Sequence, residues 1–289
     1  MTSTDQTKTT FSFELFPPKT EKGITRMRDT VAALNARNPE FFSVTYGAGG
    51  STQRNTFATV DWIREQGIAV APHLSCIGST RDELLEILMR YAEQGIDRIV
   101  ALRGDLPSGS GAGSMGDLNH ANELVALIRE HFADTFAIEV AAYPEMHPQA
   151  ANMDRDIENF KLKAEAGASS AITQYFYNAD AYAAFVDACT QRGIDIPIVP
   201  GIMPITNFSN LVRFSDACGA EIPRWLRKRL EAFGDDTASI VAFGTDVVAG
   251  LCQRLLDMGA PGLHFYTMNQ AAPTLAIWEQ LGLDNSAAA

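Results

Sequence analysis

Short runs of β-branched and aromatic residues alternate along the chain with longer segments in which apolar residues recur at helical spacing. These longer segments are amphipathic, as "RDELLEILMRYAEQG" at 81–95 illustrates, and several end in glycine, as helices commonly do. Eight strands that alternate with helices in one chain are typical of the (β/α)8 barrel, or TIM barrel, of the α/β class. The runs predicted to form these strands cover residues 10–16, 41–47, 68–76, 98–105, 137–144, 170–177, 196–202 and 262–268.

The last two predicted strands are about twice as far apart as the others, with roughly residues 204–261 between them. Helical patterns fill this interval, so we expect extra helices between the seventh and eighth strands that cover one rim of the barrel. We expect a single catalytic domain over residues 1–289. Its ends, 1–9 and 284–289, are polar or low in complexity and are predicted to be disordered tails.

A doubly wound sheet is the competing fold, because "TYGAGGST" after the second predicted strand superficially resembles a dinucleotide-binding fingerprint. That fingerprint needs three glycines at fixed spacing at the start of a helix and an acidic residue about 20 positions later. Gly47, Gly49 and Gly50 miss this spacing. These glycines more simply allow the backbone to approach a ligand closely.

Composition narrows the function classes. The net charge of -12 argues against a nucleic-acid surface, and we see no apolar run of the ~18 residues that a membrane span needs. The cysteines are far apart and no histidine lies at metal-ligand spacing, so we expect no metal site and a reducing, cytoplasmic location. These cysteines are Cys76, Cys189, Cys218 and Cys252.

The first predicted strand contains an acidic residue among aromatic ones. Strand alternation places Ser12, Glu14 and Phe16 toward the barrel axis if their neighbours face the helices. A carboxyl group among apolar neighbours can keep its proton near neutral pH, which a general acid requires. The alternative is a strand-end acid that reaches solvent or Lys19. Polar residues also end the next five predicted strands, where barrel active sites lie: Thr45, His73, Asp105, Tyr143 and Gln174.

Each of these residues also has a structural interpretation. Asp105 could pair with a neighbouring arginine, and His73 or His147 could be a satisfied structural histidine. Gln174 lies in an otherwise apolar or aromatic run, so either backbone groups or a heterocyclic ligand must satisfy its amide. Tyr143 and His147, in "AAYPEMHPQ", could present their rings to a flat ligand.

A set of motifs in fixed order is more specific than any single residue: "FELFPPK", "SVTYGAGGST", "PHLSC", "ALRGD", "AAYPEMHP", "AGASSAITQYFY", "VPGIMP" and "HFYTMN". From about residue 10 to 283 the chain resembles the methylenetetrahydrofolate reductase family in its bacterial, catalytic-barrel form. The resemblance implies a flavoenzyme that uses FAD to carry a hydride from NADH or NADPH to 5,10-methylenetetrahydrofolate by a ping-pong mechanism. It also implies a homo-oligomer.

The resemblance implies roles for individual residues. Glu14 matches the family's general acid, and Asp105 matches the acid close to the flavin and pterin. Gln174 and Phe214 match substrate-binding positions. The positions that match FAD contacts are Thr45, Tyr46, Ala48, His73, Arg103, Gly104, Asp105, Tyr143, His147, Ala150, Asp156, Asn159 and Lys163.

Three positions depart from the family's common pattern. Asn210 stands where glutamine is common, Gln270 where arginine is common, and His120 where a tyrosine contacts FAD. Loss of the arginine removes a charge-assisted bond to the folate glutamate. We therefore expect Asn210 and Gln270 to bind the substrate, but through contacts that differ from those of the family's common residues.

Two other functions known for barrels lack the residues that they need, since the lysines lie in predicted loops or helices and no histidine and aspartate ligands cluster. A Schiff-base aldolase needs a lysine at a strand end, and a metal-dependent hydrolase needs clustered ligands. The alternatives that remain are a flavin-free reductase of the same reaction and a catalytically silent flavin or folate binder. The sequence does not distinguish NADH from NADPH.

Overall fold

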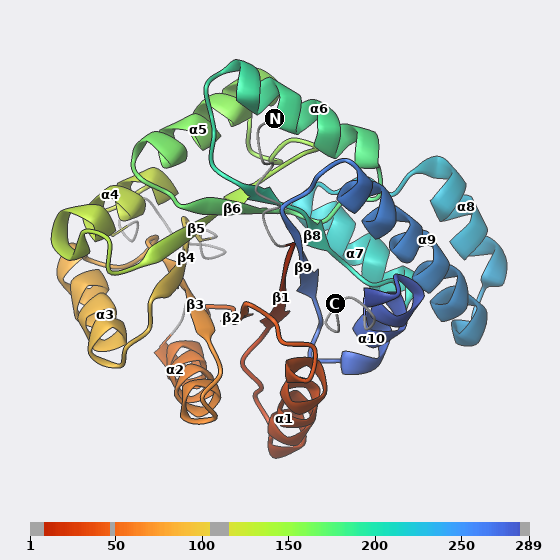
Figure 1. Cartoon of the computed structure of the whole chain (residues 1–289), viewed down its shortest axis with the longest axis horizontal. Coiled ribbons are helices and arrows are strands. Elements are labelled where there is room, and N and C mark those ends of the chain that lie inside the picture. Colours follow the sequence, from red (N-terminus) through yellow and green to blue (C-terminus); the bar gives the residue numbers. More distant parts are fainter. Residues whose placement is uncertain (1–8, 47–49, 105–115, 284–289) are drawn as a thin grey trace, which may run out of the picture.

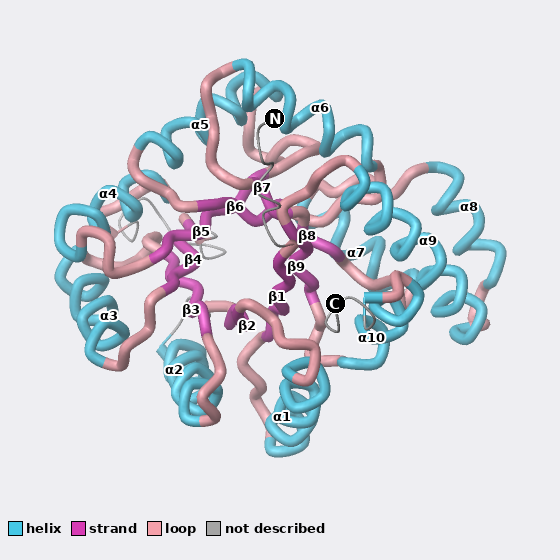
Figure 2. The backbone as a smooth tube through the Cα atoms, in the orientation of Figure 1, coloured by secondary structure: helices cyan, strands magenta, loops and turns pink. Residues whose placement is uncertain are grey.

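The computed structural model describes residues 9–46, 50–104 and 116–283, and the strands of this part form one parallel barrel inside a layer of helices (Figure 1, Figure 2). The two predicted tails lie largely outside the described residues. The strands are β1 (Thr10–Leu15), β2 (Phe41–Val44), β3 (Val70–Ser75), β4 (Arg98–Leu102), β5 (Ala137–Ala142), β6 (Ser170–Thr173), β7 (Ile198–Val199), β8 (Gly201–Ile202) and β9 (Gly262–Tyr266).

All eight predicted strands are confirmed, the seventh as two short pieces. Pro200 separates β7 from β8, because proline has no N–H group for the ladder. β7 pairs with β6 and β8 pairs with β9, while β9 also pairs with β1. The sheet order β7-β6-β5-β4-β3-β2-β1-β9-β8 therefore closes the barrel at the interrupted strand.

Helices alternate with the strands, and polar caps begin most of them. Thr80 begins α3 with a capping box to Glu83, and Asn152, Asn178 and Asn207 accept backbone N–H groups at the starts of α5, α6 and α7. The helices up to the insert are α1 (Glu21–Asn35), α2 (Gly50–Glu65), α3 (Arg81–Glu93), α4 (Ala121–Phe132), α5 (Met153–Glu165) and α6 (Ala179–Gln191).

The predicted insert is confirmed as three helices between β8 and β9: α7 (Phe208–Cys218), α8 (Arg224–Phe233) and α9 (Thr237–Asp257), and α10 (Ala271–Gln280) follows β9. The expectation that no segment is apolar enough to cross a membrane was wrong for α9, whose 21 residues pass on length and on a mean hydropathy of 1.3. Ile240, Val248 and Leu255 are buried on this helix, which contacts α6, α8 and α10. Packing in the outer layer accounts for its apolar composition.

Strand alternation divides the side chains between two regions. Phe13 and Leu15 are buried in the main core between β1 and the helices, whereas Ser12 bonds to a residue inside the barrel. Within the barrel, a small apolar cluster consists of Phe41, Ala71, Val100 and Ile172. The predicted inward orientation of β1 is therefore confirmed at Ser12.

Gly201 tests the barrel closure. A Cβ added there would lie 2.1 Å from the carbonyl oxygen of Thr173 and 2.6 Å from the ring of Tyr266. We expect Gly201→Ala to lower the free energy of unfolding by about 2 kcal/mol or more, because the Thr173 carbonyl and the Tyr266 ring must move. Gly250→Ala on α9 is the control, since nothing lies within 4 Å of its added Cβ, and it should be neutral or stabilising by ~0.5–1 kcal/mol. Urea unfolding of both variants measures this, and equal stability would contradict the close approach at Gly201.

Candidate active site

A cavity of about 610 Å³ opens at the C-terminal ends of the strands. Its inner wall is apolar, and polar or aromatic groups surround its mouth, which is the usual position and character of a barrel active site. The apolar wall consists of Val100, Leu102, Val140, Ala141 and Ile172.

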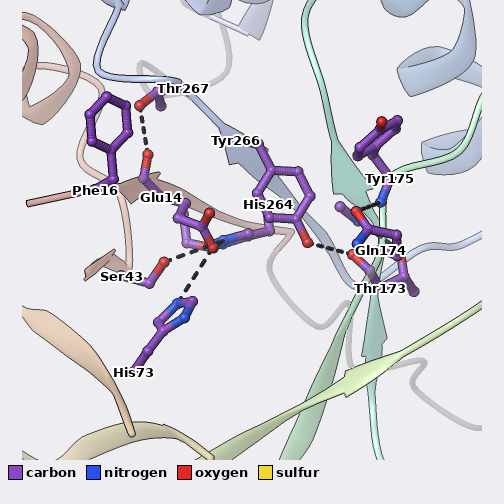
Figure 3. Close-up of polar contacts among 12 residues, drawn as sticks. Glu14, Phe16, Ser43, His73, Thr173, Gln174, Tyr175, His264, Tyr266 and Thr267 are labelled. Atoms are coloured by element: carbon purple, nitrogen blue, oxygen red, sulfur yellow. Dashed lines mark hydrogen bonds and ion pairs between the residues drawn. The ribbon is translucent and has the colours of Figure 1, made fainter. Parts of the chain in front are cut away.

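Glu14 lies at the end of β1 and lines this cavity. Its Oε2 atom is 3.4 Å from Nε2 of His73 and 3.8 Å from Nε2 of His264, and its side chain is only 20% exposed (Figure 3). Its backbone carbonyl accepts a hydrogen bond of 2.6 Å from Thr267. Among the described residues, its ion-pair contacts are to these histidines and not to Lys19.

His73 lies in the C-terminal half of β3 and is buried. Burial of its ring lowers its pKa to about 4, while the Glu14 carboxylate opposes this shift and the His264 ring adds to it. His73 is therefore a neutral ring at physiological pH, and it can offer Glu14 an N–H or a lone pair without carrying charge.

The end of β9 fixes the opposite wall. Tyr266 donates a hydrogen bond of 2.6 Å to the carbonyl of Thr173 across the barrel, in the space that Gly201 leaves. Asn269 accepts from the N–H of Phe16 (3.0 Å) and donates to its carbonyl (2.8 Å). The loop after β1, which carries Phe16 next to Glu14, is therefore fastened to the loop after β9.

Asn269 makes these bonds from a left-handed backbone conformation. Both Met268 and Asn269 have positive φ, 51° and 52°. This conformation is uncommon for residues other than glycine and clusters at functional sites.

Gln174 lines the cavity from the end of β6, and α7 of the insert covers the rim beside it. The Gln174 amide oxygen accepts the N–H of Tyr175 (3.0 Å), and the Tyr175 hydroxyl bonds to Ser215 on α7 (3.0 Å). Phe214, Ala217 and Cys218 of the same helix line the cavity. The predicted covering of one rim by the insert is confirmed.

The sequence of the chain is similar to known proteins over nearly its whole length. The family model described as "Methylenetetrahydrofolate reductase" matches residues 1–282. The chain belongs to the methylenetetrahydrofolate reductase family. It is 41% identical to the 5,10-methylenetetrahydrofolate reductase of Salmonella typhimurium over 94% of this chain and 90% of that protein. The Escherichia coli enzyme of the same name is 40% identical over the same shares.

Two further similarities extend the comparison. "Methylenetetrahydrofolate reductase (NADH) 1" of Arabidopsis thaliana is 36% identical over 97% of this chain, which matches 49% of that longer protein. A solved structure of a Clostridium thermocellum protein, titled as binding two copies of 5-methyl-5,6,7,8-tetrahydrofolic acid, superposes with a TM-score of 0.68. It covers 94% of both chains at 17% identity, which supports the barrel fold alone.

The structure brings eight of the residues expected for a methylenetetrahydrofolate reductase to one cavity. They come from the ends of β1 to β6 and from α7, as the sequence predicts for a barrel mouth. These residues are Glu14, Thr45, Tyr46, His73, Gly104, Tyr143, Gln174 and Phe214.

A second group lies beside the cavity, around the loop after β5. Arg103 donates a hydrogen bond of 2.7 Å to Gln149, and the His147 N–H donates one of 2.7 Å to Asp156. Lys163 donates to the carbonyl of Ala141, a cavity residue, and burial lowers its pKa to about 8 despite the charge of Asp156. Ala150 closes the same loop with a backbone bond to His147.

Other expected residues do not line the cavity. Asn159 and Asn210 are exposed on α5 and α7, His120 is the exposed N-cap of α4, and Gln270 is the exposed N-cap of α10. Their assigned contacts stay predictions. Ala48 and Asp105 lie outside the described residues, and so does most of the loop that precedes His120.

Sequence reasoning missed several cavity residues. Tyr266 and Met268 could have been predicted from "HFYTMN", whose polar and aromatic residues continue a predicted strand past its end. The positions of Ser75, Tyr175 and Met203 in the cavity wall are evident only from the structure. Among the described residues, no group of three or more histidine, cysteine, aspartate or glutamate side chains could hold a metal ion, and the four cysteines are free.

His73 predicts a pH dependence of stability. Unfolding returns its pKa from about 4 to the ordinary 6.5, so between these values the unfolded chain binds a proton that the folded chain does not. Acidification through this window should therefore lower the free energy of unfolding, by about 2 kcal/mol at pH 5 from this group. His73→Gln should abolish that part of the loss between pH 7 and pH 5 in urea unfolding.

The exposed His131 provides the matched control. His131→Gln should leave the pH dependence as in the unmodified protein. If His73→Gln loses as much stability on acidification as the unmodified protein, burial of a neutral His73 is not the cause.

Proposed function

We propose that this chain reduces 5,10-methylenetetrahydrofolate to 5-methyltetrahydrofolate, with a hydride that NADH or NADPH delivers through bound FAD in a ping-pong reaction. The observation that carries the proposal is the position of Glu14, a carboxyl group at the open end of a largely apolar cavity that also contains Gln174. Family membership supplies the substrate class.

The residues present fit FAD. The apolar inner wall suits a flat ring system, and the rings of Tyr143 and His147 meet edge to face at 4.5 Å beside it. Gly104 has φ of 85°, and a Cβ there would lie 2.9 Å from Ser75, so a glycine keeps the backbone close to its neighbour at the cavity edge.

Positive charge gathers beside this wall. Arg103, Lys163 and His147 would hold the diphosphate through charge-assisted hydrogen bonds, and Asp156 orients the His147 backbone. When bound, FAD accepts and returns the hydride, a chemistry that no protein side chain supplies.

The chain's own residues would do the rest. Glu14 would give its proton to the nitrogen of the folate five-membered ring whose bond to the one-carbon unit breaks. This proton transfer leaves a carboxylate facing His73. Gln174 would hold the folate or the nicotinamide through its amide, and Phe214 would pack over it. The apolar wall would exclude water from the reacting atoms.

Several finer assignments belong to the same proposal. Asp105 is proposed to stabilise the cationic state of the opened folate, and Asn210 and Gln270 to contact the substrate tail. One rice relative and one Arabidopsis relative carry NADH in their names. For this chain the proposal includes either NADH or NADPH as the hydride donor. A cytoplasmic location and a homo-oligomeric state also stay predictions.

Glu14→Gln separates the two half-reactions. The amide cannot donate an acidic proton, so folate reduction should slow by about 10²- to 10⁴-fold, whereas reduction of the flavin by NADH should change little. Stopped-flow absorbance of each half-reaction measures this. Glu158→Gln on the exposed face of α5 is the control, and equal slowing of both half-reactions by Glu14→Gln would assign Glu14 a structural role.

Cofactor content separates the proposal from a flavin-free reductase. We expect protein purified under mild conditions to be yellow, and Lys163→Met to retain less FAD because it removes a cation beside the cavity. Absorbance spectra and FAD titration measure both. Folate reduction by NADH in protein that contains no flavin, with none added, would overturn the role of FAD and leave the reductase activity in place.

A further inference from the structure

A cluster of buried polar side chains lies next to Glu14 inside the barrel, and the proposed function does not use it. It consists of His264 on β9, Ser12 on β1 and Ser43 on β2, of which His264 is fully buried. Buried polar groups cost free energy unless they are hydrogen-bonded, and the neighbouring cluster inside the barrel is apolar. The burial of His264 at this position is therefore unfavourable unless its two ring nitrogens have hydrogen-bond partners.

Strand register brings these residues together. Ser12 pairs with His264 across β1 and β9, and Glu14 pairs with Ser43 across β1 and β2. The Ser12 Oγ atom is 2.7 Å from Nδ1 of His264, while Nε2 lies 3.4 Å from Ser43 Oγ and 3.8 Å from Glu14 Oε2 (Figure 3).

The ring of His264 has one orientation. Phe41 stacks on it, with ring centres 6.1 Å apart and planes at 29°, and the Tyr266 ring lies edge to face with it, with ring centres 5.4 Å apart. Nδ1 therefore stays at Ser12, and Nε2 stays at Ser43 and Glu14. A proton on Nε2 points an N–H at two oxygen atoms and leaves Nδ1 to accept the Ser12 hydroxyl, whereas the other tautomer would point a lone pair at a carboxylate.

We propose that His264, oriented by Ser12, is a positioning residue for Glu14, whose Nε2–H stabilises the carboxylate left when Glu14 gives its proton to the folate. This inference rests on the proposed function. The proton passes from Glu14 to the substrate nitrogen, and His264 neither gains nor loses one. At 3.8 Å the contact is longer than a direct hydrogen bond, so the N–H acts through its dipole.

Other titratable groups also face this pair. Among the described residues they are His73 on β3, 3.4 Å from Glu14, and Tyr266 on β9, whose pKa burial raises, with the Glu14 charge adding to the shift. The guanidinium group of Arg98 on β4 lies over the ring of Phe41, with its Cζ atom 4.6 Å from the ring centre, and Phe41 in turn stacks on His264. A test must leave these groups in place.

A pair of variants isolates the Nε2–H. In His264→Gln the amide nitrogen reaches the place of Nε2, whereas the shorter side chain in His264→Asn ends near the place of Nδ1. Both variants lose the ring and its packing. A purely structural role would therefore affect them alike, and only loss of the donor distinguishes Asn from Gln.

The first readout is the pH profile of folate reduction in single turnover, between about pH 5.5 and pH 9. With the donor lost, Glu14 keeps its proton to higher pH, so His264→Asn should move the half-maximal pH upward by about 0.5–1 unit. His264→Gln should stay close to the unmodified protein. Reduction of the flavin by NADH should change less than about two-fold in both.

The second readout does not need activity. The chain has five histidines, so ¹⁵N-histidine NMR spectra can be assigned by substitution. His264 should show the Nε2–H tautomer, and Ser12→Ala, which keeps the ring, should mix the tautomers and shift the half-maximal pH upward as well. Carboxyl ¹³C titration of Glu14 should show the same upward shift in His264→Asn. Ser12→Ala carries the test if His264→Asn fails to fold.

The outcomes are distinct. Equal pH profiles for His264→Gln and His264→Asn, or an Nδ1–H tautomer in the unmodified protein, overturn the inference. Unmodified protein that does not reduce methylenetetrahydrofolate overturns the proposed function instead, while the tautomer and the Glu14 titration still decide the role of His264.

Discussion

Parallel pairing of β9 with both β1 and β8 closes the barrel, and the positions of the polar groups in the site depend on it. The register places His264 beside Ser12 and Tyr266 beside Glu14 on one side, and Gly201 beside His264 on the other. Because side chains alternate along a strand, a shift of one residue would turn each of these groups to the helical layer. The absence of a side chain at Gly201 is part of the same constraint, since Tyr266 occupies that space.

The electrostatics of the site follow from this closure. Side chains fill most of the interior of an eight-stranded barrel, so an unpaired charge is costly there. His73 illustrates the effect, because burial outweighs the attraction of the nearby carboxylate and lowers its pKa. Salt bridges that bury full charges, such as Arg98 with Glu139, lie toward the N-terminal end of the strands instead.

The sequence predicts much of this arrangement because its signals are local. The period-2 pattern of β1 identifies Glu14 as an inward carboxyl group, and the doubled spacing before the last strand predicts the inserted helices. The interruption at Pro200 and the high hydropathy of α9 were missed, although α9 itself was predicted as a helix. Burial by distant neighbours decides how a proline or an apolar segment is used. The Ser12–His264 contact joins residues 252 positions apart. No local pattern specifies such a register, which depends on the closure of the whole sheet.

The Asn269 bridge to Phe16 joins the loop after the first strand to the loop after the last one. During synthesis on the ribosome, therefore, Glu14 emerges early but acquires His264, Tyr266 and Thr267 as neighbours only when β9 leaves the exit tunnel. Closing a loop of this length carries an entropic cost that is paid before the contacts of β9 with β1 form. A chain shortened before residue 262 would contain most of the cavity wall and β2, but it would lack β9, the second partner strand of β1, and the hydrogen bonds from Asn269 to Phe16. The surroundings of Glu14 are thus completed only after the last strand of the barrel has been synthesised.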